Sequence, residues 1–243
     1  ILSVLRTHTS VFRDLDEHAA EKAILLESLR PGGLAVLNGD DPRVAKMADR
    51  SRFRVCLVGT SPAFDLWADQ ISSRWPDRLR LRAHQGERDY LVETQLIGAH
   101  WAPSVLAALA AAQSLGVSLR DAGQALRRVE PFDARMQPVK LPSGAIMIRD
   151  DYNASIDTIE VSLRTLEEAR AQRRVLVITD FSDSGKNRRQ RLKFLGAWAG
   201  GRVELLVLIG ENHDYGRRRA IEAGMAPEAT HGFAILEEAA AFL

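Results

Sequence analysis

Arg174-Val-Leu-Val-Ile-Thr179 and Val203-Glu-Leu-Leu-Val-Leu-Ile209 are two short apolar runs, separated by a helical pattern from Asn187 to Trp198. Such runs are typical of strands buried on both faces of a parallel sheet. The helix of about 12 residues between them supplies the crossover that parallel strands need. This stretch therefore predicts α/β architecture with a mostly parallel, doubly wound, Rossmann-like sheet.

The same alternation extends outward in both directions. In the second half we expect a strand at Ala145-Ile-Met-Ile148 and helices at Thr158 to Ala171, Tyr215 to Gly224 and Leu236 to Leu243. In the first half we expect helices at Asp14 to Leu29, Pro103 to Leu115 and Leu119 to Val129, a strand at Leu34 to Leu37 and a hairpin at Arg78 to Val92. Glu130-Pro-Phe-Asp-Ala134 is interpreted as a linker, which predicts domains at 1–131 and 132–243.

The bulk composition is ordinary for a globular protein: of 243 residues, 46% are hydrophobic and 27% charged, with a net charge of +1. That balance argues against a dedicated nucleic-acid surface. Basic residues do cluster at Lys186 to Lys193 and at Arg217 to Arg219, and we interpret them as solvated helix faces rather than binding patches.

No apolar run approaches about 20 residues, so no membrane span is expected. A lone cysteine, Cys56, is expected to be a buried strand thiol and suits a reducing cytosol. We expect a cytoplasmic monomer.

A histidine and a lysine near the start of the chain, His8 and Lys22, stand fourteen residues apart in strand, loop and helix. By itself this is a weak signal, because a lone helical lysine is usually solvated. The surrounding string, Ile1-Leu-Ser-Val-Leu-Arg-Thr-His8, Glu21-Lys22 and then Leu29-Arg-Pro-Gly-Gly-Leu-Ala-Val-Leu-Asn-Gly-Asp-Asp-Pro42, resembles the central ATP-binding domain of Mur ligases. The resemblance implies that His8 binds Mg²⁺ and that a carbamylated Lys22 provides hard oxygen ligands for it.

The segment Gly98-Ala-His100-Trp101-Ala-Pro-Ser104 resembles the Gly-x-His-Asn-x-x-Asn segment with which the family meets adenine. His100 and Ser104 are thereby implied in nucleotide binding. Trp101 and Ser104 replace two asparagines, whose amides pair with donors and acceptors of a base edge. Trp101 is open to two interpretations, a packed aromatic near a helix start or a ring that stacks on the base.

Two further motifs extend the resemblance into the second domain. Asp133-Ala-Arg135-Met136-Gln-Pro-Val139 resembles the family's Gly-Arg-Met-Glu-Pro-Val, which implies that Arg135 acts in catalysis by reaching the nucleotide phosphates with its bidentate fork. Arg149-Asp150-Asp-Tyr152-Asn153-Ala154 is similar to the string of the branch that adds D-alanyl-D-alanine. That similarity implies nucleotide contacts for Asp150, Tyr152 and Asn153. Without it, the string is a polar strand-to-helix turn.

Two acidic or glycine-containing loops are weaker candidates. Asn38-Gly-Asp40-Asp41-Pro42 suggests metal binding, but we favour a structural interpretation in which Asp41 caps a helix that Pro42 opens. Asp180-Phe-Ser-Asp-Ser-Gly185-Lys186 does not satisfy the phosphate-loop pattern. It is similar to the Gly-Asp-Met loop of the family's C-terminal domain, where substrate peptide binding is possible.

The resemblance covers nearly the whole chain and implies an ATP- and Mg²⁺-dependent ligase that joins an amine to a carboxylate through an acyl phosphate. A UDP-sugar-peptide-like molecule is the implied substrate. The family's Gly-rich phosphate-binding loop is not in the sequence, and both ends read as cut, so we expect a piece of a longer chain that is inactive alone. The alternatives are a non-catalytic Mur-like binding protein and a ligase with an acceptor outside peptidoglycan.

Overall fold

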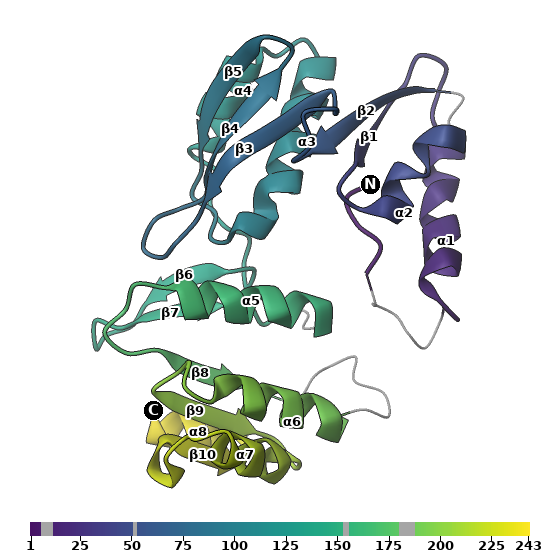
Figure 1. The fold of residues 1–243 in the computed structure, drawn as a ribbon. Helices are drawn as coiled ribbons and strands as arrows, with labels where there is room; N and C mark the ends of the chain where they lie inside the picture. Colours follow the sequence, from purple (N-terminus) through teal and green to yellow (C-terminus); the bar gives the residue numbers. More distant parts are fainter. Residues whose placement is uncertain (6–11, 51–52, 153–155, 180–187) are drawn as a thin grey trace. The chain divides into compact units, whose positions relative to one another are not determined.

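The computed structural model describes residues 1–5, 12–50, 53–152, 156–179 and 188–243 (Figure 1). The chain divides into two compact units, Ile1–Tyr152 and Asn153–Leu243. Each unit has its own apolar core. Among the described residues, no helix is both long enough and apolar enough to cross a membrane.

The first unit is built on a mixed five-stranded sheet in the order β1-β2-β3-β4-β5. The first three strands are parallel, and the last two run antiparallel as a hairpin. Their bounds are β1 Leu34–Asn38, β2 Arg54–Gly59, β3 Leu66–Ser72, β4 Arg80–Gln85 and β5 Arg88–Glu93. The expected strand at Leu34 and the expected hairpin at the sheet edge are therefore confirmed, whereas β3 was not predicted.

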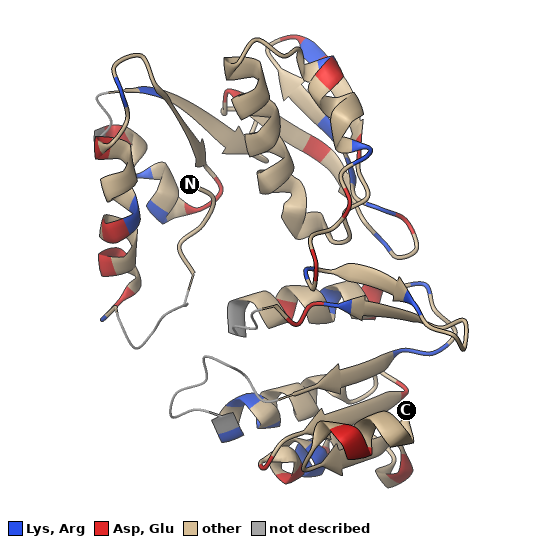
Figure 2. Ribbon diagram, turned by 180° about the vertical axis from the view of Figure 1, so that it is seen from behind, with Lys and Arg blue, Asp and Glu red and all other residues tan. Residues whose placement is uncertain are grey.

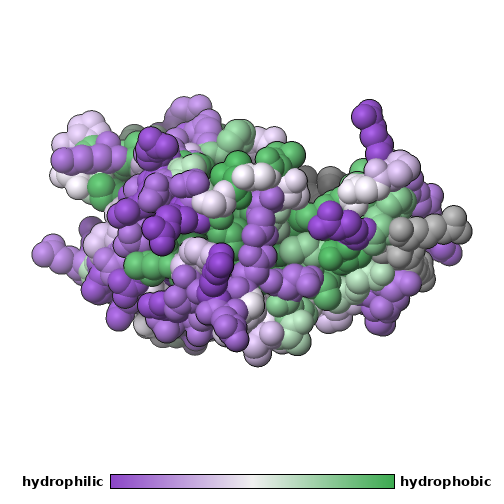
Figure 3. Space-filling model, turned by 90° about the horizontal axis from the view of Figure 1, so that it is seen from above, coloured by the Kyte–Doolittle hydropathy of each residue, from purple (hydrophilic) through white to green (hydrophobic). Residues whose placement is uncertain are grey.

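Helices cover both faces of the β1–β2 half of this sheet. The helices are α1 Leu15–Glu27, α2 Pro42–Ala45, α3 Ala102–Ser114 and α4 Leu119–Leu126. Val36 and Cys56 pack into the core that contains α3. Their strand neighbours Ala35 and Leu37 pack into the core that contains α1 and α2. Alternate strand residues thus serve opposite layers, as the two-residue side-chain period requires. Hydrophobic side chains also reach the outer surface (green in Figure 3).

Asp41 fastens the start of the chain to this sheet. Its carboxylate accepts the N–H groups of Arg43 (2.9 Å) and Val44 (3.2 Å), which caps α2 at Pro42. The other oxygen accepts the N–H of Val4 at 2.7 Å. Asp40 in turn accepts the backbone N–H and hydroxyl of Thr60. The structural interpretation of this acidic pair is therefore confirmed for Asp41 and extends to Asp40.

The polypeptide then forms a short antiparallel hairpin of β6 Gln137–Lys140 and β7 Ile146–Arg149. The strand expected at Ala145 thus begins one residue later, and its partner β6 was not predicted. The turn that enters the hairpin is unusual, because Ala134 (φ 54°) and Met136 (φ 49°) both lie in the left-handed region. Both side chains are buried, so this turn is packed rather than loose.

The second unit carries a parallel three-stranded sheet in the order β10-β9-β8. Its strands are β8 Val175–Ile178, β9 Leu205–Ile209 and β10 Thr230–Phe233, and its helices are α5 Ile156–Glu168, α6 Arg188–Ala199, α7 His213–Glu222 and α8 Leu236–Phe242. The central strand β9 is buried along its length. The parallel α/β architecture expected here is confirmed; the weakly apolar β10 was not predicted.

Glycines set the packing of α6 against α7. A Cβ atom at Gly196 would clash with the backbone carbonyl of Gly216, and one at Gly200 would lie 2.5 Å from the carbonyl oxygen of Ala223. A Cβ at Gly216 would lie 2.6 Å from Leu208 on β9. The two helix backbones therefore meet each other and the sheet at distances that only glycine permits.

We expect Gly196→Ala to destabilise the protein, because the new methyl group meets backbone rather than a flexible side chain. Overpacking of this kind costs about 1–3 kcal/mol, which outweighs the gain of about 1 kcal/mol in helix propensity. The matched control is Gly123→Ala in α4, where the added Cβ would lie 3.8 Å from Val92. Urea denaturation should show a loss for the first variant and none for the second. Equal stability of the two variants would contradict this account of the packing.

Candidate functional site

His100 lies on a short 3-10 turn, Ala99–Trp101, that leads into α3. The preceding Gly98 has φ 103°, which favours glycine, and its N–H donates to the hydroxyl of Ser73 at 2.7 Å. This bond ties the start of α3 to the loop that follows β3. Ser73 was not predicted as a site residue, and nothing in its local sequence distinguishes it from other loop serines.

The ionisation of His100 is controlled by its surroundings. Part of His100 is open to solvent. Desolvation of the imidazole nevertheless lowers the pKa of His100, and the negative charge of Asp150 raises it by a smaller amount. The imidazole is therefore neutral at pH 7 and offers one donor and one acceptor. The structure thus brings the electrostatic influence of Asp150 to the residue that the sequence predicted to meet the base.

Trp101 follows His100 and packs, half-buried, against the core of the first unit. This is the packed aromatic of the two interpretations left open by the sequence. Its indole Nε1 is buried and has no hydrogen-bond partner among the described residues. Ser104 lies in the first turn of α3, half-buried. His100 and Ser104 are therefore placed by the same helix start.

Arg135, Asp150 and Tyr152 come together at one end of the β6–β7 hairpin. The Asp150 carboxylate accepts the N–H of Met136 at 3.2 Å, and the Tyr152 N–H donates to the carbonyl of Ala134 at 3.2 Å. The Arg135 guanidinium lies 4.5 Å from the centre of the Tyr152 ring. These contacts hold the arginine from both sides of the turn, so its fork is positioned before any ligand arrives.

The neighbouring charges are arranged differently. Arg149 forms a two-point pair with Asp151, both bonds at 3.1 Å, and a further ion pair with Asp133 at 3.2 Å. The adjacent acids Asp150 and Asp151 thus have distinct partners. The side chain of Arg135 forms no ion pair with an acidic residue in the described ranges, so its cation–π contact leaves the guanidinium donors available for an anion.

A second arginine lies in the loop between β3 and β4. The guanidinium of Arg78 is 4.8 Å from the ring centre of Trp75, and burial lowers the pKa of Arg78 while Glu130 raises it. Its Nη1 atom is buried and makes no hydrogen bond within the described part of the chain. Arg78 was not predicted as a site residue, because a lone arginine before a strand carries no motif.

The predicted metal residues are placed less completely. Lys22 is half-buried on α1. The pKa of the Ile1 amino group is lowered, mainly because that group is partly buried and to a smaller extent because of the positive charge of Lys22. His8, Asn153 and the loop Asp180 to Lys186 lie outside the described residues. Within residues that are described, no cluster of three or more His, Cys, Asp or Glu is arranged for a metal.

Cys56 lies on β2, as expected, but is half-buried rather than fully buried. The pKa of the Cys56 thiol is raised to about 11, mainly by burial and to a smaller extent by the negative charge of Asp65. The thiol is therefore protonated at pH 7 and is a poor nucleophile.

Two relatives match well by sequence. A UDP-N-acetylmuramoyl-tripeptide–D-alanyl-D-alanine ligase from Mycobacterium tuberculosis (strain CDC 1551 / Oshkosh) is 29% identical over 98% of this chain and 46% of its own length. A UDP-N-acetylmuramoylalanine–D-glutamate ligase from Desulfitobacterium hafniense (strain DSM 10664 / DCB-2) is 26% identical over 82% of the chain and 44% of its own length. The chain thus spans about half the length of these relatives.

Solved structures agree on the fold. Crystal structure II of MurF from Acinetobacter baumannii superposes with a TM-score of 0.87 at 21% identity, over 99% of this chain and 51% of that one. MurF from Thermotoga maritima in complex with ADP gives a TM-score of 0.73 at 14% identity, over 96% of this chain and 57% of that one.

Family models account for most of the sequence. The Mur ligase middle domain matches residues 1–112, and the Mur ligase glutamate ligase domain matches residues 134–243. Both matches fall in the order in which the motifs occur along the chain. The chain therefore belongs to the Mur ligase family and carries sequence of its middle and C-terminal domains.

Proposed function

We propose that the protein to which this chain belongs is an ATP-dependent ligase that forms an amide bond through an acyl phosphate. The observation that supports this most directly is the preset Arg135, held by the Tyr152 ring and by the turn that Asp150 ties down. A planar, permanently charged fork beside a carboxylate is suited to a nucleotide, with the fork on phosphate and the carboxylate on a ribose hydroxyl. The matched relatives are named as ligases that act on UDP-N-acetylmuramoyl compounds.

The residues have distinct proposed roles. Arg135 binds the phosphates, Asp150 the ribose, and His100 with Ser104 the base; Tyr152 and Asn153 complete the nucleotide contacts. The neutral His100 fits this role, because it offers a donor and an acceptor rather than a charge. Lys22 and His8 would hold Mg²⁺, which neutralises charge on the transferring phosphate when bound. The half-buried position of Lys22 is compatible with that role.

The substrate is proposed to be a UDP-muramoyl-peptide-like molecule in cell-wall precursor synthesis. The Asp150-Asp-Tyr-Asn-Ala154 string and the name of the Mycobacterium tuberculosis relative both favour D-alanyl-D-alanine as the amine. We place the reaction in the cytoplasm and the protein as a monomer. The domain boundary is proposed between residues 131 and 132, although the hairpin β6–β7 packs with the first compact unit.

A second candidate function is a non-catalytic Mur-like protein that binds a partner or precursor without turnover. Trp101 and Ser104 favour it, because they stand where the family's motif has two amides. The packed Trp101 occupies its position with a ring whose N–H is buried. The presence or absence of an intact phosphate-binding loop in the complete protein discriminates between the two functions.

We expect the 243-residue chain by itself to show no ligase activity. The Gly-rich loop whose backbone N–H groups cradle phosphates in this family is not in the sequence. Phosphate release should be measured with ATP, Mg²⁺, UDP-muramoyl-tripeptide and D-alanyl-D-alanine. Release above background that depends on both the tripeptide and the dipeptide would contradict this expectation.

In the complete protein, Arg135→Lys should lower kcat/KM for ATP by about ten-fold or more, because lysine keeps the charge and loses the bidentate fork. Arg127→Lys is the matched control, since Arg127 is an exposed arginine paired with Glu93 at 2.8 Å. The control should stay within about two-fold of the unmodified protein. Steady-state kinetics that show equal effects at both positions would refute the role assigned to Arg135.

Replacement of Trp101 and Ser104 by asparagine in the complete protein should strengthen binding of Mg²⁺–ATP if the altered segment has weakened the base site. Each polar contact regained contributes about 1 kcal/mol, so the pair contributes about 2 kcal/mol and roughly a thirty-fold gain is expected. Trp101→Phe is the control, because it keeps ring packing without adding an amide. Calorimetry that shows tight binding already in the unmodified protein, with no gain on substitution, would establish Trp101 and Ser104 as an adequate base site.

A further inference from the structure

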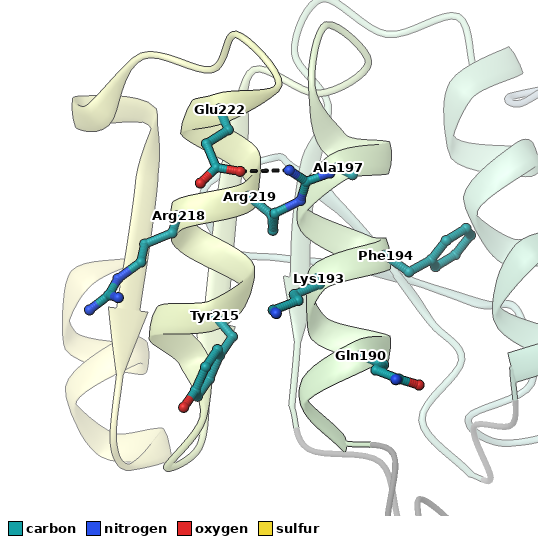
Figure 4. A pocket seen from close by; sticks show the side chains of 8 residues that line it. All are labelled: Gln190, Lys193, Phe194, Ala197, Tyr215, Arg218, Arg219 and Glu222. Atoms are coloured by element: carbon teal, nitrogen blue, oxygen red, sulfur yellow. Dashed lines mark hydrogen bonds and ion pairs between the residues drawn. The ribbon is translucent and has the colours of Figure 1, made fainter.

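A groove runs between α6 and α7 on the surface of the second unit, and none of the residues assigned to the nucleotide lines it (Figure 4). Its volume is about 680 Å³. The lining residues are Gln190, Lys193, Phe194 and Ala197 on α6, and Tyr215, Arg218, Arg219 and Glu222 on α7. On both helices these positions follow the spacing i, i+3, i+4, i+7, so each wall is one continuous face of two turns.

The walls of the groove are cationic. The described helix α6 contains Arg189, Arg191 and Lys193 and no acidic residue, and α7 contains three consecutive arginines (blue in Figure 2). Arg219 pairs with Glu222 at 2.6 Å. Lys193 and Arg218 are exposed and form no ion pair within the described part of the chain. Positive charge is therefore concentrated here in a chain whose net charge is +1.

Aromatic contacts hold part of this charge in place. The guanidinium of Arg189 lies 4.9 Å, and the ammonium of Lys193 5.8 Å, from the centre of the Tyr215 ring. In Figure 4, Lys193 points between the two helices, and Phe194 extends from α6 on the side away from α7. The exposed fraction of Phe194 is 39%, large for an aromatic side chain. The groove thus combines fixed cations with an apolar edge.

We propose that the groove between α6 and α7 is a docking site for an acidic amphipathic helix of a partner protein. Two parallel walls with helical spacing accept a third helix along the groove, as in helix-in-groove recognition. Each wall extends over eight residues, whose seven helical rises correspond to about 10 Å, or two turns of the incoming helix. Acidic side chains of that helix meet Lys193 and Arg218, and its small apolar residues cover Ala197 and the Phe194 ring.

Other polyanions fit the groove less well. Nucleic acid would bring phosphates along the whole length, including the end where Glu222 lies. A membrane surface is flat and would not enter a groove between two helices. A short helix with acids at one end and neutral residues at the other matches the charge distribution along the groove.

The test uses the full 243-residue chain and a fluorescein-labelled peptide of about 15 residues, built from Glu, Ala and Leu, with leucines at i, i+3 and i+7 and with its glutamates confined to one end. Fluorescence anisotropy should show saturable binding. Lys193→Glu with Arg218→Glu should weaken it by about ten-fold or more. The matched control reverses two exposed arginines elsewhere, Arg88→Glu with Arg120→Glu, and should stay within about two-fold. Circular dichroism establishes that both double variants are folded.

Ala197→Phe provides a second measurement, because it fills the groove without changing charge and should also weaken binding. A scrambled peptide of the same composition should bind at least about ten-fold less tightly than the amphipathic one. The proposal is overturned if the labelled peptide does not bind, if the scrambled peptide binds equally well, or if the groove variants behave like the control. It is also overturned if single-stranded DNA or phosphatidylglycerol vesicles compete more effectively than the unlabelled amphipathic peptide.

Discussion

The left-handed backbone at Ala134 and Met136 is the constraint on which the candidate site depends. An alanine at positive φ costs about 1 kcal/mol or more relative to glycine, and a β-carbon-bearing residue remains there only when its surroundings fix it. Here Asp150 binds the N–H of Met136, Tyr152 binds the carbonyl of Ala134, and both strained side chains are buried. The backbone of Arg135, which lies between them, is therefore fixed, and so is the direction in which its side chain leaves the backbone. The corresponding family motif has glycine at the position of Ala134, which agrees with the conformation found.

Much of the fold could be predicted because apolar periodicity reports burial directly. The runs at β1 and β9 lie in buried or partly buried strands, and Asp41-Pro42 caps a helix in the way its chemistry requires. The run at β8 also forms a strand, but Val175 and Val177 are exposed, so the expectation of burial on both faces is wrong there. The strands that escaped prediction lack that signal. β10 is Thr-His-Gly-Phe and β6 is Gln-Pro-Val-Lys, and each is a strand because a neighbouring strand pairs with it. Pairing is a tertiary effect, which a local pattern does not contain.

The candidate site divides in the same way. The motif strings identified Arg135, Asp150, Tyr152 and His100 as residues of interest. The hairpin contacts between the first three, and the effect of the Asp150 charge on His100, depend on the folded structure. Ser73 accepts a hydrogen bond from Gly98, and Arg78 packs over the ring of Trp75, and nothing in their local sequence distinguishes them. Trp101 had two reasonable interpretations at the sequence level, because the same ring can pack or stack, and its contact with the core decides between them.

The glycine seam between α6 and α7 has a consequence for recognition on the outer side of the same helices. Because the two backbones are in contact through Gly196 and Gly216, main-chain atoms prevent the two helices from moving closer together. A surface built in this way is already in its bound shape, so little ordering entropy is lost when it is occupied. For the helix proposed to dock here, the width of the groove is therefore a criterion of selection beside charge.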